Sequence, residues 1–121
     1  MSETVQATRL VLVVDDDAGV RDVVVTLLEL SDHDVLAASG GAEALRMLAA
    51  NPAIDLVVSD VRMPGMSGIE LAAQVGARHP GVPVVLISGY FQAEKDGVHF
   101  LKKPFSLEEL QAAVLTALRT A

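Results

Sequence analysis

Acidic residues follow two apolar stretches of this chain, an arrangement that predicts a metal site. Asp15 and Asp16 come directly after the aliphatic residues 10–14, and Asp60 follows a second apolar stretch. Neighbouring carboxylates repel each other, by about 1 kcal/mol per pair in water and about 4 kcal/mol at a protein-like dielectric for charges roughly 4 Å apart. A divalent cation bound among them would offset this repulsion. Because the ligands would all be oxygen atoms, a hard ion such as Mg²⁺ is expected.

Two later apolar stretches lead to Ser88 and Lys103, and these residue types suit phosphoryl transfer. Mg²⁺ and the lysine can neutralise the oxygens of a phosphoryl group, while the serine hydroxyl can donate a hydrogen bond to it. Asp60 stands alone after its stretch, so it is the best candidate for an attacking carboxylate, whereas adjacent Asp15 and Asp16 suit the ion. The product would be an aspartyl phosphate that water can hydrolyse, which describes a reversible switch rather than a metabolic catalyst.

The elements that must position these residues alternate between strand and helix. Short apolar runs, typical of strands in a buried parallel sheet, occupy residues 10–14, 34–37, 54–59, 82–88 and 98–101. Because functional groups gather at the carboxyl ends of parallel strands, the polar residues that follow these runs are expected to meet at one edge of the sheet. The alternation predicts an α/β fold, a doubly wound parallel sheet of five strands with helices on both faces.

Local signals predict the helix boundaries and the faces that they bury. Asp17 is expected to cap the first helix, whose buried stripe would be Val20, Val23, Val24, Leu27 and Leu28. A second helix is predicted over residues 40–51, and the serine and glutamate at positions 67 and 70 form a capping box for a third, which extends to residue 78. Ser106 and Glu109 would cap the last helix, with a buried stripe of Leu107, Leu110, Val114 and Leu118.

Length and composition limit the classes of protein that this chain can belong to. A chain of 121 residues with 51% hydrophobic residues fits one domain, expected over residues 9–121 after a flexible extension of residues 1–8. The net charge of −7 and the scattered basic residues argue against direct nucleic-acid binding. The absence of cysteine excludes disulfides and thiolate metal sites. No apolar run is long enough to span a bilayer, so we expect a cytoplasmic protein without membrane insertion. The three histidines, His33, His79 and His99, are expected at the surface.

Four motifs give the chain a resemblance to a known family. The segments VVDDD, VVSDVRMPGMSGIEL, LISGY and KKPF occur in the order and at the spacing of the receiver domain of two-component response regulators. The resemblance covers essentially the whole chain and implies a flavodoxin-like strand order of 2-1-3-4-5. It also implies a phosphorelay switch that catalyses its own phosphorylation and dephosphorylation. The phosphoryl donor would be a histidine of a sensor kinase or phosphotransfer protein, or a small acyl phosphate.

The resemblance also implies a role for each residue of the predicted site. Asp60 would be the phosphoacceptor, and Mg²⁺ would be bound by Asp16 directly, by Asp15 mostly through water, by Asp60 and by the backbone carbonyl of Arg62. Lys103 would bind the phosphoryl group, with a cis peptide before Pro104. Ser88 would supply the switch hydroxyl, and Phe100 falls at the aromatic switch position of the family, although an aromatic residue on a terminal strand can equally be part of the core.

One region departs from the common pattern of that family. Only 14 residues separate Ser88 from Lys103, too few for a full helix with two loops and a strand, so the fourth helix of the family is expected to be shortened. This spacing, with the segment FLKKPFSLEEL, resembles the C-terminal receivers of hybrid histidine kinases. A stand-alone regulator and a receiver from a longer kinase both fit. The sequence identifies neither the cognate kinase nor the downstream target.

Two other classes of function stay open at this point. A Mg²⁺-dependent phosphatase of the haloacid dehalogenase type also uses an aspartate nucleophile, in the motif D-x-D-x-T/V. Asp15 and Asp17 have the required spacing, but Gly19 occupies the last position of the motif and the chain has no insertion for a cap domain. The second alternative is a receiver-like module that binds partners without being phosphorylated.

Overall fold

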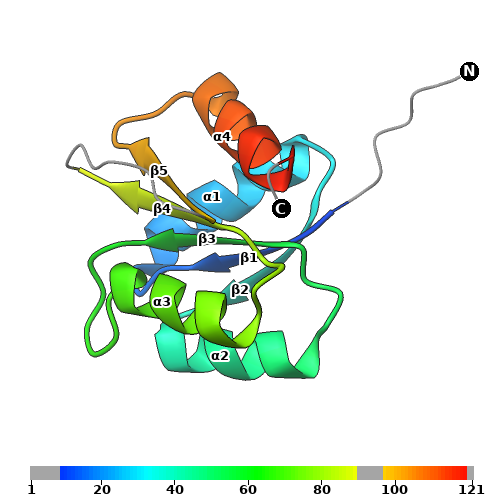
Figure 1. Ribbon diagram of the computed structural model, residues 1–121. Helices are drawn as coiled ribbons and strands as arrows, with labels where there is room; N and C mark the ends of the chain where they lie inside the picture. Colours follow the sequence, from blue (N-terminus) through cyan, green and yellow to red (C-terminus); the bar gives the residue numbers. More distant parts are fainter. Residues whose placement is uncertain (1–8, 90–96, 120–121) are drawn as a thin grey trace, which may run out of the picture.

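The structure, a computed structural model, describes residues 9–89 and 97–119 as one α/β unit (Figure 1). Its five strands are parallel and lie in the order β2-β1-β3-β4-β5, which confirms the predicted fold. The strands are β1 (Leu10–Val14), β2 (Asp34–Ala38), β3 (Leu56–Asp60), β4 (Val84–Ser88) and β5 (Val98–Lys102). The helices of the described residues are α1 (Ala18–Leu30), α2 (Gly41–Ala50), α3 (Gly68–Arg78) and α4 (Leu107–Arg119).

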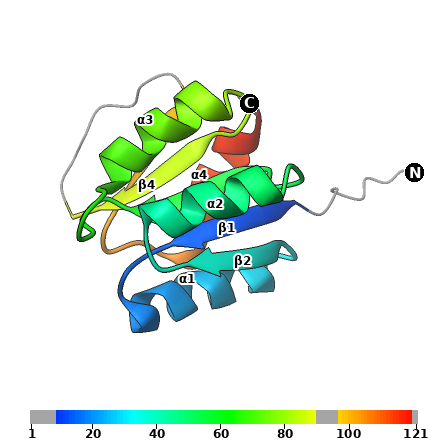
Figure 2. The same ribbon diagram turned by 90° about the horizontal axis from the view of Figure 1, so that it is seen from below.

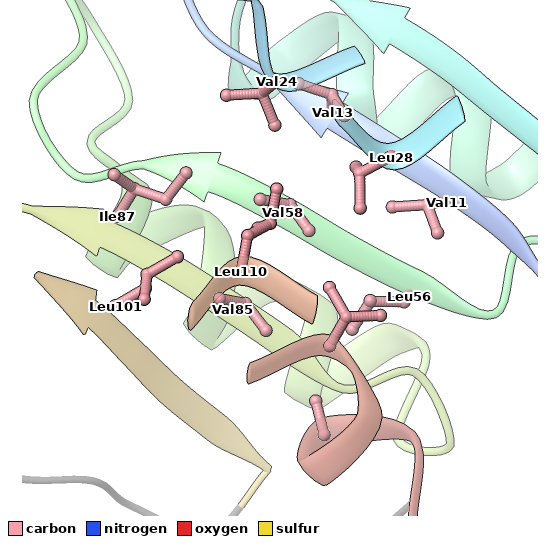
Figure 3. Close-up of a cluster of buried hydrophobic side chains, with 12 residues drawn as sticks. Val11, Val13, Val24, Leu28, Leu56, Val58, Val85, Ile87, Leu101 and Leu110 are labelled. Carbon is pink, nitrogen blue, oxygen red and sulfur yellow. The ribbon is translucent and has the colours of Figure 1, made fainter. Parts of the chain in front are cut away.

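Helices cover both faces of the sheet, with α1 and α4 on one face and α2 and α3 on the other (Figures 1 and 2). Successive strand residues point to opposite faces, so Val11 and Val13 pack against α1 and α4 while Leu12 and Val14 pack toward α2 and α3. Figure 3 shows the first of these two cores, in which side chains of the three central strands meet Val24 and Leu28 of α1 and Leu110 of α4. This packing holds the carboxyl ends of the strands at one edge.

The predicted helix caps are present in the structure. The Asp17 carboxylate accepts a hydrogen bond from the backbone N–H of Val20 at the start of α1. Ser67 and Glu70 form a complete capping box at the start of α3. Ser106 and Glu109 exchange the same two hydrogen bonds before α4.

The predicted buried face of α1 is partly wrong. Val24 and Leu28 are buried and Leu27 is partly buried, but Val20 is 38% exposed and Val23 is 58% exposed. The helix meets the sheet along the line through Val24 and Leu28, which turns the other two valines outward. The apolar stripe predicted for α1 is therefore wider than the face of this helix that the sheet covers.

The prediction that His99 lies at the surface is also wrong. His99 is 8% exposed because it alternates with Phe100 along β5 and therefore shares a face with Leu101, the face that α4 covers. His33 and His79 are partly buried. Strand β3 also differs from its prediction, since it begins at Leu56 and includes Asp60.

Two predictions concern segments that lie mainly outside the described residues. The expected flexible extension, residues 1–8, is one of them. The other is the shortened fourth helix, which would fall on residues 90–96; among the described residues, only Gly89 and Gly97 separate β4 from β5 in the sequence, and neither is helical. Among residues 9–89 and 97–119, no helix has both the length and the apolar character needed to cross a membrane.

Candidate functional site

The carboxyl ends of β1, β3, β4 and β5 bring the predicted site residues together. Asp15 follows β1, Asp60 ends β3 and Ser88 ends β4, while Lys103 directly follows β5. The backbone N–H of Lys103 donates to the carbonyl of Ser88 over 2.8 Å, so the ends of β4 and β5 are held in register. A cavity of about 570 Å³ opens at this edge, lined by Asp60, Val61, Arg62, Ile87, Ser88, Gly89 and Lys103.

An ion pair joins the side chains of Lys103 and Asp60. The lysine Nζ lies 2.9 Å from the aspartate Oδ1, and the side chains are 40% and 12% exposed, respectively. The neighbouring Lys102 is exposed, because alternation along the strand turns it away from the site. The peptide bond between Lys103 and Pro104 is cis, as predicted.

Three carboxylates form a compact acidic cluster beside this ion pair. One carboxylate oxygen from each of Asp15, Asp16 and Asp60 lies within 4.8 Å of the other two. Asp15 is buried, Asp60 is partly buried and Asp16 is exposed. Burial raises the pKa of Asp15, and repulsion from Asp60 and Asp16 raises it further. A hydrogen bond from the backbone of Asp17 and the charge of Lys103 act in the opposite direction on this pKa.

Hydrogen bonds at three points hold Asp15. Its backbone N–H donates to the carbonyl of Ala38 in β2, over 3.1 Å. Its carboxylate Oδ1 accepts from the backbone N–H of Asp17 over 2.9 Å. Its carbonyl oxygen accepts from Nη1 of Arg21, a residue of α1, over 2.8 Å. The end of β1 is therefore fixed to both β2 and α1.

The loop between β3 and α3 is held closely against the backbone of Asp60. The hydroxyl of Ser59 donates to the Asp60 carbonyl oxygen over 2.9 Å. The backbone N–H of Gly68 donates to the carbonyl of Val61 over 2.8 Å. A Cβ atom on Gly68 would lie only 2.2 Å from the Asp60 carbonyl oxygen, so any larger residue would push the loop away. Arg62, whose carbonyl is a predicted metal ligand, lies within this loop and borders the cavity.

The two predicted switch residues lie on β4 and β5. Ser88 is 4% exposed and borders the cavity beside Lys103. Phe100 is partly buried and packs against the core between the sheet and the helices α2 and α3. Its position is compatible with both interpretations made from the sequence, a core aromatic and a switch.

The donor set at this edge fits Mg²⁺. The cluster consists of carboxylate oxygens, the ligand type that hard divalent ions prefer, and it holds more negative charge than the single nearby lysine can neutralise. Asp15, Asp16, Asp60 and the carbonyl of Arg62 would hold such an ion. The arrangement can bring a nucleophilic carboxylate, a cation and a lysine to one phosphoryl group.

Three supports of the site were not predicted from the sequence: the Arg21 side chain, the backbone N–H of Asp17 and the close approach of Gly68 to Asp60. The signal for Arg21 was present, since an arginine in the second turn of a helix can reach back to the strand that precedes it. The other two supports depend on backbone geometry.

A sheet of strand order 2-1-3-4-5 with three aspartates and a lysine at its carboxyl edge defines the receiver class of signalling domains. The chain belongs to the response regulator receiver domain family, whose model matches residues 11–115. It is therefore the receiver domain of a two-component system.

Curated relatives of the chain are longer proteins. It is 37% identical over 115 residues to the response regulator protein PilR of Pseudomonas aeruginosa, covering 89% of this chain and 26% of PilR. It is 36% identical over 119 residues to the DNA-binding transcriptional regulator NtrC of Escherichia coli, covering 90% of this chain and 24% of NtrC. The chain thus spans about a quarter of the length of these relatives.

Solved structures of receiver domains are similar to the chain over almost its whole length. The receiver domain of the hybrid histidine kinase CckA is 38% identical with a TM-score of 0.79, covering 90% of this chain and 98% of that chain. The response regulator TrrA of Thermotoga maritima, solved in complex with Mg²⁺ and BeF, is 28% identical with a TM-score of 0.83, covering 92% of this chain and 100% of that chain.

Proposed function

We propose that this receiver domain accepts a phosphoryl group on the carboxylate of Asp60 in the presence of Mg²⁺ and acts as a reversible switch. One observation carries the proposal: the Asp60 carboxylate lies 2.9 Å from the Lys103 ammonium and within 4.8 Å of the carboxylates of Asp15 and Asp16. A nucleophile, a phosphate-binding cation and a metal-binding pair are therefore within reach of one phosphoryl group.

In the proposed reaction an oxygen of Asp60 attacks phosphorus in line with the bond to the donor. A P–O bond to the carboxylate forms while the bond from phosphorus to the leaving group breaks, and the leaving group keeps the electron pair. Bound Mg²⁺ would neutralise charge on the phosphoryl oxygens. The Lys103 ammonium would leave its ion pair with Asp60 and contact a phosphoryl oxygen, where it stabilises the negative charge that develops during transfer. Water would later attack phosphorus as the P–O bond to Asp60 breaks, which restores the free carboxylate and releases inorganic phosphate.

The proposed donor is a phosphohistidine of a sensor histidine kinase or of a phosphotransfer protein. In that case the leaving group is the imidazole ring, which departs as a neutral base after taking one proton. The similarity to the receiver domain of the hybrid histidine kinase CckA supports a donor of this class.

The proposed switch responds to the charge that phosphorylation adds, about −1.5 to −2 at neutral pH. Ser88 borders the same cavity as Asp60, which supports a role for its hydroxyl as a hydrogen-bond donor to a phosphoryl oxygen. A movement of Ser88 would change the end of β4, which pairs with β5, the strand that carries Phe100. We propose that phosphorylation shifts the balance between two arrangements of these strand ends.

The phosphatase alternative loses its main support in the structure. Its motif needs both Asp15 and Asp17 in the site, but the carboxylate of Asp17 caps α1. Asp17 is also outside the acidic cluster, whose members within the described part of the chain are Asp15, Asp16 and Asp60.

Incubation with acetyl phosphate or phosphoramidate and Mg²⁺ tests the proposal. Intact-mass spectrometry should show the addition of one phosphoryl group that hydroxylamine removes, as expected for an acyl phosphate. The variant Asp60→Asn should show no addition. Asp17→Asn, which changes a nearby carboxylate outside the cluster, should be phosphorylated like the wild type.

Two results would contradict the proposal. Absence of a labile adduct in the wild-type protein with either donor would favour a module that binds without phosphorylation. An adduct that persists in Asp60→Asn would place the acceptor elsewhere. If Asp60 is phosphorylated as proposed, profiling of phosphotransfer from purified sensor kinases would identify the donor.

A further inference from the structure

We propose that Arg21, a residue of α1, is a positioning residue of the metal site. It orients the peptide group between Asp15 and Asp16. Its Nη1 atom donates to the carbonyl oxygen of Asp15 over 2.8 Å. The inference deepens the proposed function and rests on it, because it concerns the two aspartates that are proposed to hold Mg²⁺.

The helix brings Arg21 to this position. The backbone N–H of Arg21 donates to the carbonyl of Asp17 over 2.9 Å, so the residue belongs to the hydrogen-bonded start of α1. Side chains in a helix lean toward its amino terminus, which here is the end that faces the carboxyl edge of the sheet. The arginine therefore reaches back across the turn to β1, the strand that precedes it.

The carbonyl of Asp15 needs a donor that the sheet does not supply. In the pairing of β1 with β2 and with β3, Val14 is the last residue of β1. Asp15 is 5% exposed, so an unpaired carbonyl at this position would be shielded from water. The charged guanidinium supplies a strong hydrogen bond, and half-burial of Arg21 restricts its movement.

This hydrogen bond affects the direction of the Asp16 side chain. The carbonyl of Asp15 and the N–H of Asp16 belong to the same planar peptide group, so fixing the oxygen fixes the plane from which Asp16 projects. The Asp16 carboxylate itself is exposed to solvent and belongs to the acidic cluster. The orientation of its backbone sets the direction in which this side chain leaves the main chain, and one of its oxygens lies within 4.8 Å of those of Asp15 and Asp60.

Positioning and simple electrostatics predict opposite effects of removing Arg21. A cation near an acidic cluster repels Mg²⁺, so loss of its charge alone would tighten metal binding. Loss of a positioning residue would weaken binding, because the ligand oxygens would no longer be preorganised. The sign of the change in affinity therefore distinguishes the two roles.

The experiment is a titration of the metal-free full chain with MgCl₂, followed by the amide signals of residues 15–17 in NMR spectra. We expect Arg21→Ala to raise the Kd for Mg²⁺ by about 10-fold, the range found for residues that support metal ligands. Arg21→Lys, which keeps the charge and one donor, should recover part of the affinity. Arg46→Ala is the matched control. Arg46 lies in α2 and, like Arg21, contributes to lowering the pKa of Glu43, yet it makes no hydrogen bond to Asp15.

A second measurement tests positioning without the metal. In metal-free protein, Arg21→Ala and Arg21→Lys should both shift the amide signal of Asp16, and Arg21→Ala should increase its hydrogen-exchange rate, while Arg46→Ala should change neither. Urea unfolding would verify that each variant is folded. If Arg21→Ala does not fold, the shift of the Asp16 amide signal in Arg21→Lys tests the inference in its place.

The outcomes separate this inference from the proposed function. An Mg²⁺ affinity in Arg21→Ala equal to or tighter than that of a saturable wild type would overturn the positioning role alone. A wild type that shows no saturable Mg²⁺ binding would overturn both the metal site and the inference built on it.

Discussion

Replacing Asp15 with asparagine is expected to stabilise the metal-free protein. The Asp15 carboxylate is buried and has an oxygen within 4.8 Å of oxygens of both Asp16 and Asp60. Two unit charges at that separation repel each other by about 0.9 kcal/mol in water and by about 3.5 kcal/mol at an effective dielectric constant of about 20. The nearby Lys103 offsets part of this repulsion. We therefore expect a gain of about 1–2 kcal/mol in the free energy of unfolding at pH 7.

Thermal unfolding monitored by circular dichroism measures this gain. For a domain of this size, about 1 kcal/mol corresponds to a change of about 4 °C in Tm, so Asp15→Asn should raise the Tm of the metal-free protein by about 4–8 °C. Asparagine keeps a side-chain oxygen that can accept the hydrogen bond from the backbone of Asp17. The variant therefore removes the charge and preserves the local structure.

Addition of Mg²⁺ should reverse the order of stability. A ligand at about 100 times its Kd stabilises the folded state by about 2.7 kcal/mol, and the wild type should show a gain of this size. Asp15→Asn should gain less, because one charged ligand is missing.

Asp17→Asn is the matched control for this prediction. It removes one negative charge two residues away, but from an exposed cap outside the acidic cluster, and asparagine is an equally good N-cap. Its Tm should stay close to that of the wild type with or without Mg²⁺. A lower Tm for metal-free Asp15→Asn, or an equal rise in both variants, would refute the proposed crowding of charge in the cluster.

Three further predictions concern the supports of the fold. Gly68→Ala should lose about 1–3 kcal/mol of stability and be phosphorylated more slowly, because the added Cβ would lie 2.2 Å from the Asp60 carbonyl oxygen. The control is Gly76→Ala, in an open position of the same helix, which should not lose stability. Ser67→Ala should lose about 1 kcal/mol in urea unfolding because it removes the cap of α3, and an unchanged midpoint would contradict this role. Burial lowers the pKa of His33 below its ordinary value of 6.5, so protonation of this side chain favours the unfolded state, and the protein loses stability as the pH falls below 6.5. The drop in Tm between pH 7.5 and pH 5.5 should therefore be smaller in His33→Gln than in the wild type, and an equal drop would contradict the assignment.

Local sequence patterns were enough to predict the fold and to predict which residues would meet at the edge of the sheet. Five short apolar runs, most of them separated by helical patterns, allow few arrangements other than a doubly wound parallel sheet, since parallel strands need crossover connections of one handedness. Because such a sheet gathers its carboxyl ends at one edge, residues as distant in the chain as Asp15, Asp60 and Lys103 could be predicted to meet. The caps at Asp17, Ser67 and Ser106 were predictable because a capping hydrogen bond spans only three residues.

The orientation of these residues and their surroundings could be known only from the packed structure. The predicted stripe of α1 included Val20 and Val23, but which part of a stripe is buried depends on how the helix meets the sheet. His99 is buried because α4, which follows β5 in the chain, covers one face of that strand. The contact of Arg21 with Asp15 likewise depends on the direction of a helix relative to the preceding strand. Sequence patterns report local periodicity, whereas burial and contact distances arise only when the elements pack together.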